Sequence, residues 1–386
     1  MSRLAVEHLR SSGASNAPAC FIPPADRRWT RLLAETPHDV YHTPGYVTVA
    51  ARQENAIPVA LYAEYGSAAS LVPLLLRPVP EHLGAPPGWL DAVSPYGYPG
   101  PLIAGNPRVD VTSRLLAACK DGARDAGIIS IFMRSHPLIP LPPTSMRSLG
   151  RAVRHGDTVY IDLRDHQDEI WHRMRENHRT QIRRLVNGGF TSRLDQWEQL
   201  PQFVALYLRS MVRHCAAPFY FFPERYFVEL REALGGGLHM CTIHGPAGEL
   251  ASAGLFTETG GIVQYHLGCS SDDFRRHAPS KLMFHEMQRW AAGRGNRIFH
   301  LGGGVGCQSD SQLFQFKAGF SPLRAGYWTF RMVLDRARYA ELIRRRNALM
   351  HDATPAGSNL FPLYRDQTCR TPEDTRPFQT AMSHSS

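Results

Sequence analysis

The sequence contains none of the segments by which membrane-spanning or exported chains are recognised. No apolar run approaches the roughly 20 residues that a transmembrane helix needs. The N-terminal residues include no apolar core of roughly 7–15 residues, so we expect no signal peptide. Seven cysteines are scattered along the chain, but none forms a C-x-x-C pair of the kind found in metal and redox sites. These absences favour a cytoplasmic protein that neither inserts into a membrane nor holds a metal ion.

Lysine is scarce. Of the 43 basic residues only three are lysines, at positions 120, 281 and 317, and the others are arginines. The net charge of +9 and the pI near 9.3 favour an anionic partner without identifying it. No G-x-x-x-x-G-K-[ST] phosphate loop occurs, and counting from Gly302 puts Cys307 where a dinucleotide fingerprint needs its last glycine. Both common nucleotide-binding motifs are therefore excluded.

A weak internal repeat divides the chain into two halves. At 386 residues the chain exceeds what one hydrophobic core usually supports. Each half contains a predicted β-hairpin, a helix, a glycine and a strand, which indicates two copies of a mixed α/β unit. In the first half these segments are residues 59–62 and 70–76, 111–126, Gly127 and 128–133. In the second half they are residues 240–244 and 250–256, followed by a strand at 262–267, then 280–292, Gly295 and 297–301.

Composition suggests where the sections of the chain begin and end. The polar, Pro/Ala-rich residues 1–25 are expected to form a flexible N-terminal arm, and the Pro/Ser-rich segment 137–150 should separate the two domains. We expect a first domain at 26–150 and a second at 151–335, followed by a C-terminal helix and loose tail at 336–386. Each domain should have a mixed central sheet flanked by helices, an α/β (α+β) fold.

A glycine-rich turn in the second half is the strongest candidate for a functional site. The apolar residues 298–301 end in Gly302 and two further glycines, and a polar bend then leads to Lys317. A glycine turn lets a ligand approach the backbone, and a lysine ammonium can neutralise an oxyanion or a phosphate. The pattern favours a group-transfer site, although a plain loop followed by core aromatic residues has the same sequence signature.

Residues 169–185 are predicted to form one unusually basic helix. Its apolar face is formed by Trp171, Met174, Ile182 and Leu185. Its other faces carry Arg173, Arg175, Arg179, Arg183 and Arg184. Two interpretations remain open: a solvated basic face over a core helix, or a phosphate-binding surface for a nucleotide or an RNA end.

Several segments, taken together, resemble the Fem aminoacyltransferases, over roughly residues 35 to 335. In the second half they are residues 160–163, 171, 177–184, 264–268, 279–283, 291–295, 300–304 and 316–320. In the first half they are residues 43–46, 73–74 and 94–101. The set is specific, although each segment alone is weak.

This resemblance implies two GNAT-like domains in tandem and the transfer of an acyl group to an amine. Fem-like members take an aminoacyl group from aminoacyl-tRNA and attach it to a peptidoglycan precursor or to a small molecule, and a related branch uses acyl-CoA. The lysine of the family's F-K-x-x-F element falls on Lys317, whose implied role is to stabilise the tetrahedral oxyanion. Relatives that use muropeptides carry a phosphate-binding lysine where this chain has Ala50, which argues against a UDP-linked substrate.

Further site residues are predicted from their residue type and their position in the sequence. Candidates for the general base are His266, His300 and Asp310, and the alternative is that the amine loses its proton to the leaving 3′-oxygen or to water. The turn at residues 94–101 is either a lining of the acceptor pocket or a bare connector. The residues expected to bind substrates are Arg179, Arg183, Tyr96, Tyr265, Gly302, Gly303, Gly304 and Phe316.

Three functions are compatible with these features. The first is an aminoacyltransferase that uses aminoacyl-tRNA as co-substrate, has no tightly bound cofactor, and acts on an amine of a cell-wall precursor or small molecule. The second is an acyl-CoA-dependent N-acyltransferase, for which Arg275 and Arg276 precede a helix start that could hold a pyrophosphate. The third is a basic RNA-binding module without catalysis. The sequence does not determine the oligomeric state.

Overall fold

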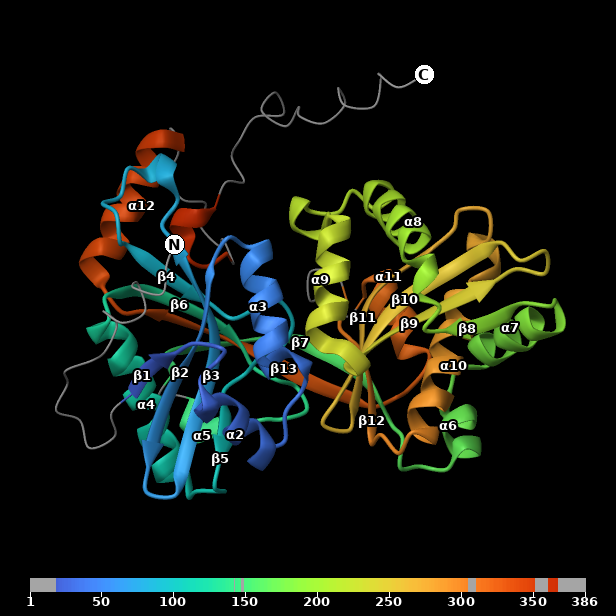
Figure 1. The fold of residues 1–386 in the computed structure, drawn as a ribbon, viewed down its shortest axis with the longest axis horizontal. Coiled ribbons are helices and arrows are strands. Elements are labelled where there is room, and N and C mark those ends of the chain that lie inside the picture. The colour runs from blue at the N-terminus through green and yellow to red at the C-terminus, as the bar shows by residue number, and fades with distance from the viewer. Residues whose placement is uncertain (1–18, 142, 147–148, 305–309, 351–359, 367–386) are drawn as a thin grey trace.

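The computed structural model describes residues 19–141, 143–146, 149–304, 310–350 and 360–366 as two lobes that lie side by side (Figure 1). The strands of the first lobe are β1 (Ala19–Ile22), β2 (Ile57–Tyr65), β3 (Ala68–Pro78), β4 (Leu90–Val93), β5 (Leu102–Ala104) and β6 (Ile128–Arg134). Those of the second are β8 (Thr191–Leu194), β9 (Leu238–His244), β10 (Leu250–Thr259), β11 (Ile262–Ser270) and β12 (Ile298–Gly302). Two further strands, β7 (Arg151–Asp162) and β13 (Arg324–Val333), connect the lobes.

The described strands form one continuous sheet in which the two lobes repeat the same order. The sheet runs β1-β2-β3-β4-β6-β13-β7-β12-β11-β10-β9-β8, and β5 pairs with β3. In each lobe a hairpin is followed by a strand that pairs in parallel with the strand after the helix: β4 with β6 and β11 with β12. Gly127 and Gly295 each end a helix with a positive φ, 75° and 79°, as the predicted repeat requires. The predicted tandem α/β architecture is confirmed.

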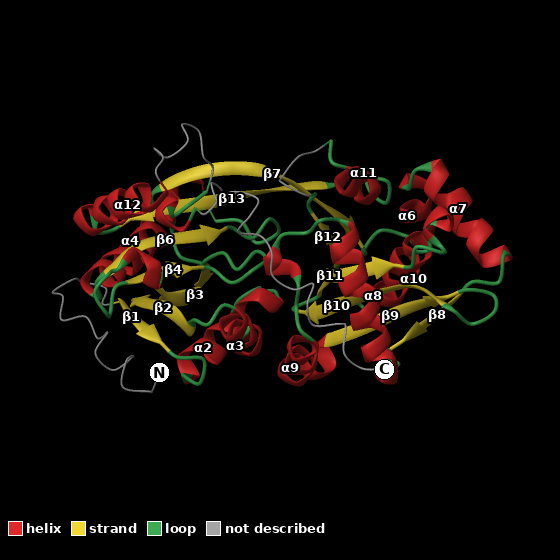
Figure 2. Ribbon diagram, turned by 90° about the horizontal axis from the view of Figure 1, so that it is seen from above, coloured by secondary structure: helices red, strands yellow, loops and turns green. Residues whose placement is uncertain are grey.

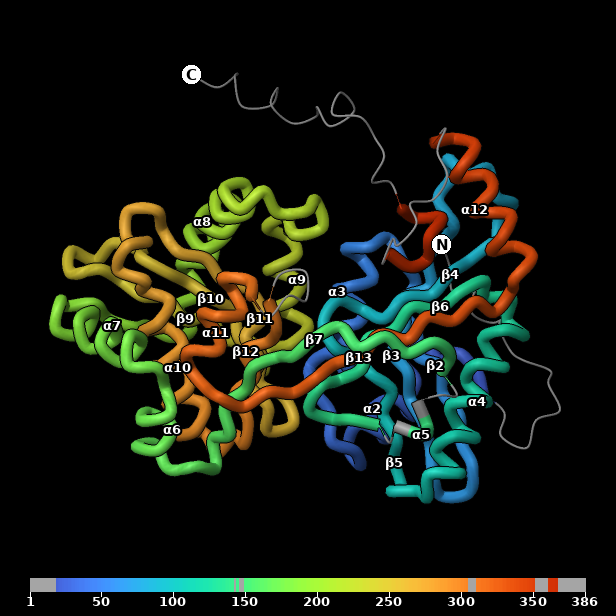
Figure 3. The backbone as a smooth tube through the Cα atoms, turned by 180° about the vertical axis from the view of Figure 1, so that it is seen from behind, coloured from blue at the N-terminus to red at the C-terminus, as the bar shows by residue number. Residues whose placement is uncertain are grey.

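The long strands β7 and β13 exchange partners between the lobes. β7 follows the first lobe in the chain but pairs with β12 of the second, whereas β13 follows β12 but pairs with β6 of the first. The two strands also pair antiparallel with each other, from Arg324↔Val159 to Arg331↔Arg151. Figures 2 and 3 show both strands crossing from one lobe to the other. The sheet therefore continues across the predicted domain boundaries at residues 150 and 335.

Helices cover the sheet on both faces. In the first lobe they are α2 (Arg27–Glu35), α3 (Pro44–Gln53), α4 (Val109–Asp125) and α5 (Pro143–Met146), and α12 (Arg336–Met350) returns to it at the end. In the second they are α6 (Gln167–Arg173), α7 (Glu176–Asn187), α8 (Leu200–Arg213), α9 (Glu224–Leu234), α10 (Ser280–Gly293) and α11 (Gln312–Ala318). Along the described chain, no helix is both long and apolar enough to cross a bilayer.

One buried cluster joins the lobes. It contains Tyr46 of α3 and Leu230 of α9, together with sheet residues of both lobes. The two helices approach closely at Gly45, where an added Cβ would lie 2.6 Å from the carbonyl oxygen of Ala233. Of the aromatic run 219–227, Phe222 and Phe227 are buried in this cluster, as a core-covering role predicts. The interface therefore places residues of the first lobe directly beside β11 of the second.

The single basic helix predicted at 169–185 is wrong, because the structure has two helices with a break at Met174 and Arg175. Both residues have extended ψ values of 140°. The backbone N–H of Arg175 donates to the carbonyl of Gly319, at 2.8 Å, instead of continuing the helix. A tertiary hydrogen bond thus competes with the helical one, which the amphipathic pattern could not reveal.

Parts of the expected N-terminal arm and of the expected loose tail are ordered elements of the fold. Residues 19–22 form β1, which pairs with β2 from Ala19↔Ala63 to Ile22↔Ala60. Near the other end, a single 3₁₀ turn (Leu363–Arg365) carries the buried Tyr364 into the core beneath α12. Residues 1–18 and 367–386 lie outside the described part of the chain.

Candidate active site

The candidate site begins where two parallel strands diverge. β11 and β12 pair at only three positions, Ile262↔Ile298, Val263↔Phe299 and Gln264↔His300. β11 then continues to Ser270 alongside β10, while β12 ends at Gly302. Backbone groups beyond Gln264 and His300 are thereby released from pairing between these strands, which leaves them available to a ligand. Residues 305–309 of the following loop lie outside the described part.

Lys317 reaches this point from α11. Its side chain is 5% exposed, and Nζ donates to the carbonyl oxygen of Gly303 at 2.7 Å. The ammonium also lies over the ring of Tyr265, 5.4 Å from its centroid, a cation–π contact. Burial lowers the pKa of Lys317 from 10.5 to about 7, because the charged form loses its hydration. An ammonium so desolvated interacts strongly with any negative charge that develops nearby.

Gly302 leaves a space beside the ammonium. Its φ of 77° lies in the left-handed region that favours glycine. A Cβ at this position would lie 3.4 Å from Lys317 Nζ, 3.9 Å from Gln264 Nε2 and 4.0 Å from the hydroxyl of Tyr98. Three polar groups from three elements therefore surround the place that a side chain would fill.

His300 and Gln264 form a buried pair at the last paired position of β11 and β12. His300 is fully buried, and its Nδ1 is hydrogen-bonded to Oε1 of Gln264. Gln264 Nε2 donates to the carbonyl of Tyr265 at 3.0 Å, which fixes Oε1 as the acceptor. Among the described residues, Nε2 of His300 has no hydrogen-bond partner. Burial, with the nearby His136 and Lys317, holds the pKa of His300 well below its usual range, so the ring is neutral.

The first lobe contributes a second buried pair. The backbone N–H of Leu138 donates to Nδ1 of His136 at 3.1 Å, so Nε2 carries the proton and donates to Asp39 Oδ2 at 3.0 Å. The ring centroid of His300 lies 6.4 Å from that of His136 and 5.6 Å from that of Tyr98. The site therefore lies between the lobes, with residues of both.

A continuous contact connects this site to the basic helix α7. His178 of α7 donates from Nε2 to the carbonyl of Phe316 at 3.0 Å, one residue before Lys317. An added Cβ on Gly319 would lie 2.4 Å from the His178 ring, so only glycine fits there. Arg175 at the start of α7 donates to both the carbonyl and the side chain of Gln315. The helix that carries the arginines is therefore fixed to the helix that carries Lys317.

Most basic side chains around α7 have no acidic partner within the described residues. Arg173 is the exception, because it pairs with Asp165 and Glu169. Arg179 contacts the carbonyl of His172, and Arg183 lies over the ring of Trp171 at 5.3 Å. We call the remaining set the basic surface, and its members are Arg175, Arg179, Arg183, Arg184, Arg275, Arg276 and Lys281. Uncompensated charge of one sign on one face is typical of a polyanion-binding surface.

The structure places the other predicted site residues in different surroundings. His266 is buried against Tyr226, whose hydroxyl lies 3.0 Å from Nε2, and against the rings of Tyr46 and Tyr96. Asp310 is exposed at the edge of the described part. Phe316 packs on Phe284 and Phe320 in the core. Gly304 is partly buried, directly before the segment that is not described. The assigned roles of all these residues stay predictions.

Other residues at the site were not identified from the sequence. Gln264, Asp39, His136 and Tyr98 carry no motif of their own, although Gln264 and Tyr98 lie inside segments that resemble the Fem family. Asp39 and His136 are 97 positions apart, and only folding brings them together. Their one signal in the sequence is the presence of polar residues within otherwise apolar surroundings, which is too common to identify a site.

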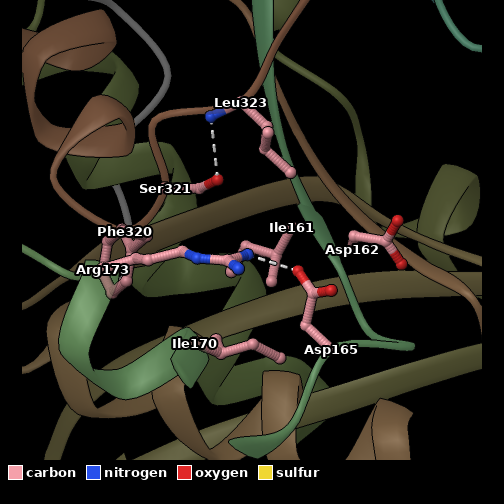
Figure 4. A pocket seen from close by; sticks show the side chains of 8 residues that line it. All are labelled: Ile161, Asp162, Asp165, Ile170, Arg173, Phe320, Ser321 and Leu323. Atoms are coloured by element: carbon pink, nitrogen blue, oxygen red, sulfur yellow. Dashed lines mark hydrogen bonds and ion pairs between the residues drawn. The ribbon is translucent and has the colours of Figure 1, made fainter. Parts of the chain in front are cut away.

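A small pocket on the second lobe is unsuited to a substrate. Figure 4 shows that it is lined by Arg173 and Asp165, which pair with each other, and by apolar residues including Ile170 and Phe320. Ser321 closes one end by accepting a hydrogen bond from the N–H of Leu323 at 3.1 Å. Because its charges are already paired, the pocket offers no group for recognition or chemistry.

Comparisons with known proteins agree with this geometry. Residues 172–312, which include β11 and β12, match the family model described as an acetyltransferase (GNAT) domain. The second half of the chain contains a GNAT acyltransferase domain. No curated protein matches the chain by sequence.

Solved structures show the same fold over most of the chain. FemX is 14% identical with a TM-score of 0.64, over 83% of this chain and 98% of its own. L-PGS from Bacillus licheniformis is 15% identical with a TM-score of 0.53, over 84% and 97%. A domain assigned to a lysylphosphatidylglycerol synthetase of Agrobacterium fabrum is 15% identical with a TM-score of 0.50, over 84% and 95%. The chain thus has the tandem fold of these proteins, and the match to the GNAT domain model lies in its second half.

Proposed function

We propose that the enzyme transfers an aminoacyl group from aminoacyl-tRNA to an amine of a small molecule or cell-wall precursor. The observation that carries this proposal is the position of Lys317, whose desolvated ammonium lies at the divergence of β11 and β12. There it would stabilise the oxyanion that forms when the amine attacks the ester carbonyl. Gly302 keeps the neighbouring space free of a side chain.

The basic surface supports tRNA as the donor. It extends over α7 and the start of α10, and His178 fixes α7 to Phe316 beside Lys317. A phosphate backbone that follows this surface would bring its acylated end toward the ammonium. Arginine binds phosphate with bidentate geometry, which suits such a path. The Agrobacterium domain is named for a lysylphosphatidylglycerol synthetase, and a lysyl group is an aminoacyl group of the kind proposed here.

Acyl-CoA is the alternative donor, and one observation favours it. α10 begins at Ser280 without a side-chain cap, and Arg275 and Arg276 lie in the 3₁₀ turn just before it (Arg275–His277). The positive end of the α10 dipole and two arginines would attract a pyrophosphate, although the N–H groups of Lys281, Leu282 and Met283 already donate to backbone carbonyls. The matching family model is also named for acetyl transfer.

Equilibrium binding distinguishes the two donors. The purified protein is titrated with a mixed pool of charged tRNA and, separately, with acetyl-CoA at near-physiological salt. We expect saturable binding of the charged tRNA and none of acetyl-CoA. The reverse result would make the enzyme CoA-dependent and the proposal wrong. Uncharged tRNA is the control that separates recognition of the acyl group from recognition of the polyanion.

A further inference from the structure

We propose that His300 is the proton acceptor of the transfer reaction, and that its bare Nε2 takes the proton from the attacking amine. This inference rests on the proposed aminoacyl transfer and adds a role that Lys317 cannot fill. A lysine that stabilises an oxyanion must keep its own proton, so the proton released by the amine needs a different acceptor.

The hydrogen bonds around His300 determine which nitrogen is free. Gln264 must present Oε1 to the ring, because its Nε2 already donates to the carbonyl of Tyr265. Nδ1 of His300 therefore carries the hydrogen and donates to Oε1. Nε2 is then a lone-pair acceptor, buried and without a partner among the described residues. A buried acceptor that satisfies no hydrogen bond costs stability, which suggests that it is retained for a function.

The other titratable groups that face His300 are already committed. His136 has both ring nitrogens occupied, one by Leu138 and the other by Asp39. Lys317 has to remain charged. Burial raises the pKa of Tyr265 far above neutrality, so this phenol stays protonated. Tyr98, which packs on the His300 ring, contributes a phenol and not a basic nitrogen. Among these neighbouring groups of the described chain, His300 is the one with an unoccupied basic nitrogen.

His266 also has a bare ring nitrogen, but its surroundings differ. Nδ1 of His266 is buried and without a partner among the described residues. The ring is enclosed by Tyr46, Tyr96 and Tyr226. Burial alone lowers the pKa of His266 to about 4, whereas Lys317 contributes to the lowered pKa of His300. His300 is hydrogen-bonded to Gln264 and packs on Tyr98, and both of these residues line the space beside Gly302 and Lys317.

The reaction balances with this acceptor. The amine nitrogen adds to the ester carbonyl carbon, and the carbonyl electron pair moves to the oxygen, which Lys317 stabilises. The nitrogen, now positively charged, gives its proton to His300 Nε2. The oxyanion then collapses, the bond from carbon to the ribose oxygen breaks, and the leaving oxygen takes the proton from His300. The products are an amide and a free ribose hydroxyl, with His300 again neutral.

The tautomer can be tested without turnover. Two-bond ¹H–¹⁵N correlation spectra of the protein labelled with ¹⁵N-histidine report which ring nitrogen carries hydrogen, and loss of a signal in His300→Asn assigns the residue. We expect a neutral ring with the hydrogen on Nδ1 from about pH 6 to 8. A hydrogen on Nε2, or a charged ring at pH 7, overturns the proposal whatever the enzyme's substrate is.

Kinetics test the role itself. His300→Asn keeps a donor near the position of Nδ1 for Gln264 but removes the basic nitrogen. With a charged-tRNA pool and glycinamide as the amine, we expect kcat to fall by about 10²- to 10⁴-fold, while KM for tRNA changes little. His285→Asn is the matched control, because Nδ1 of His285 is also buried and without a partner among the described residues, but this ring lies against Trp171.

The outcomes separate the two proposals. If His300→Asn retains kcat within about threefold of the parent while folding normally, the ring is only structural and the inference is wrong. His300→Gln repeats the test if the asparagine variant unfolds. If the parent binds no charged tRNA, the proposed donor fails, and the same variants are assayed with acetyl-CoA, where loss of kcat would still support His300. The ring spectrum decides the tautomer in every case.

Discussion

At the scale of single residues, the site depends on burying an ammonium beside a neutral imidazole. Lys317 and His300 are both nearly inaccessible to water, and Lys317 adds to the burial that lowers the pKa of His300. Burial lowers the pKa of Lys317 to about 7, so its charge changes within the physiological range. This is the pKa region in which a small change of environment has the largest effect on catalysis.

The lowered pKa predicts the pH dependence of the reaction. If oxyanion stabilisation needs the ammonium, kcat should fall as pH rises through about 7, because Lys317 loses its proton. The linkage to stability has the opposite sign: between about pH 7 and 10 the unfolded chain binds more protons, so this group makes the free energy of unfolding rise with pH.

Replacing the lysine tests this assignment. We expect Lys317→Ala to lower kcat by about 10²- to 10³-fold and to remove the descending limb of the pH profile. Lys120→Ala, on α4 of the first lobe, is the control. An unchanged kcat in a folded Lys317→Ala protein would contradict the catalytic role.

Alanine substitutions at two glycines with the same backbone conformation distinguish the cost of backbone strain from an effect on the reaction. Gly302 and Gly295 have φ values of 77° and 79°, so alanine should cost each about 1–2 kcal/mol of stability. Nothing lies within 4 Å of a Cβ on Gly295, whereas one on Gly302 would lie beside Lys317. We therefore expect similar losses in thermal denaturation but a loss of kcat only in Gly302→Ala. Equal kcat values in the two variants would mean that the space beside the ammonium is not used.

At the scale of secondary-structure elements, α7 joins the basic surface to α11, the helix that carries Lys317. One face packs through His178 and Ile182 into the core, while the arginines remain on the outside. The break before α7 turns it so that Arg175 contacts α11. The helix covers a core, as the first interpretation predicts, while phosphate binding by its arginines stays a prediction.

Salt dependence tests whether α7 contacts phosphates. In Arg179→Ala/Arg183→Ala, binding of charged tRNA should weaken, and the log–log salt slope should fall by about one unit for each lost contact. Arg108→Ala/Arg124→Ala removes two arginines from the first lobe and should leave the slope unchanged. Equal slopes for the parent and the α7 variant would mean that these arginines contact no phosphates and form an ordinary solvated face.

At the scale of the whole molecule, distant segments are joined by buried charges. The carboxylate of Asp91 in β4 is fully buried and accepts from Arg77 of β3 at 3.0 Å, and from Tyr364 at 2.8 Å and Arg365 at 2.6 Å. These contacts hold the C-terminal turn against the first lobe, which explains why the predicted loose tail is partly folded.

Removing this charge should destabilise the protein. We expect Asp91→Asn to lower the free energy of unfolding by about 3–5 kcal/mol, because two arginines lose their buried partner. Asp121→Asn breaks the exposed pair with Arg124 and should cost under about 1 kcal/mol. Urea denaturation measures both values. A cost for Asp91→Asn as small as that of the control would mean that water replaces the pair.

The strands and helices that the sequence predicts correctly are those whose formation depends on residues close together in the chain. β2 and β3 meet at Tyr65↔Ala68 around the predicted turn, and α4, α10 and the strands after them lie where the periodicity places them. Lys317 was identified by resemblance, and the structure adds its burial and its contact with Gly303. Asp39, His136 and Gln264 were missed because no local pattern distinguishes a polar residue at a site from one that is simply satisfied in the core.

By itself the sequence determined the order hairpin, helix, glycine and strand in both halves, because hydrophobic period and left-handed glycines act over a few residues. It also supplied the one lysine that follows the glycine turn. Only the tertiary structure decided that β7 and β13 exchange lobes, that Gly319 interrupts the basic helix, and that His136 meets His300. Each of these depends on contacts between residues about 100 or more positions apart, and such contacts form only when the two lobes fold together.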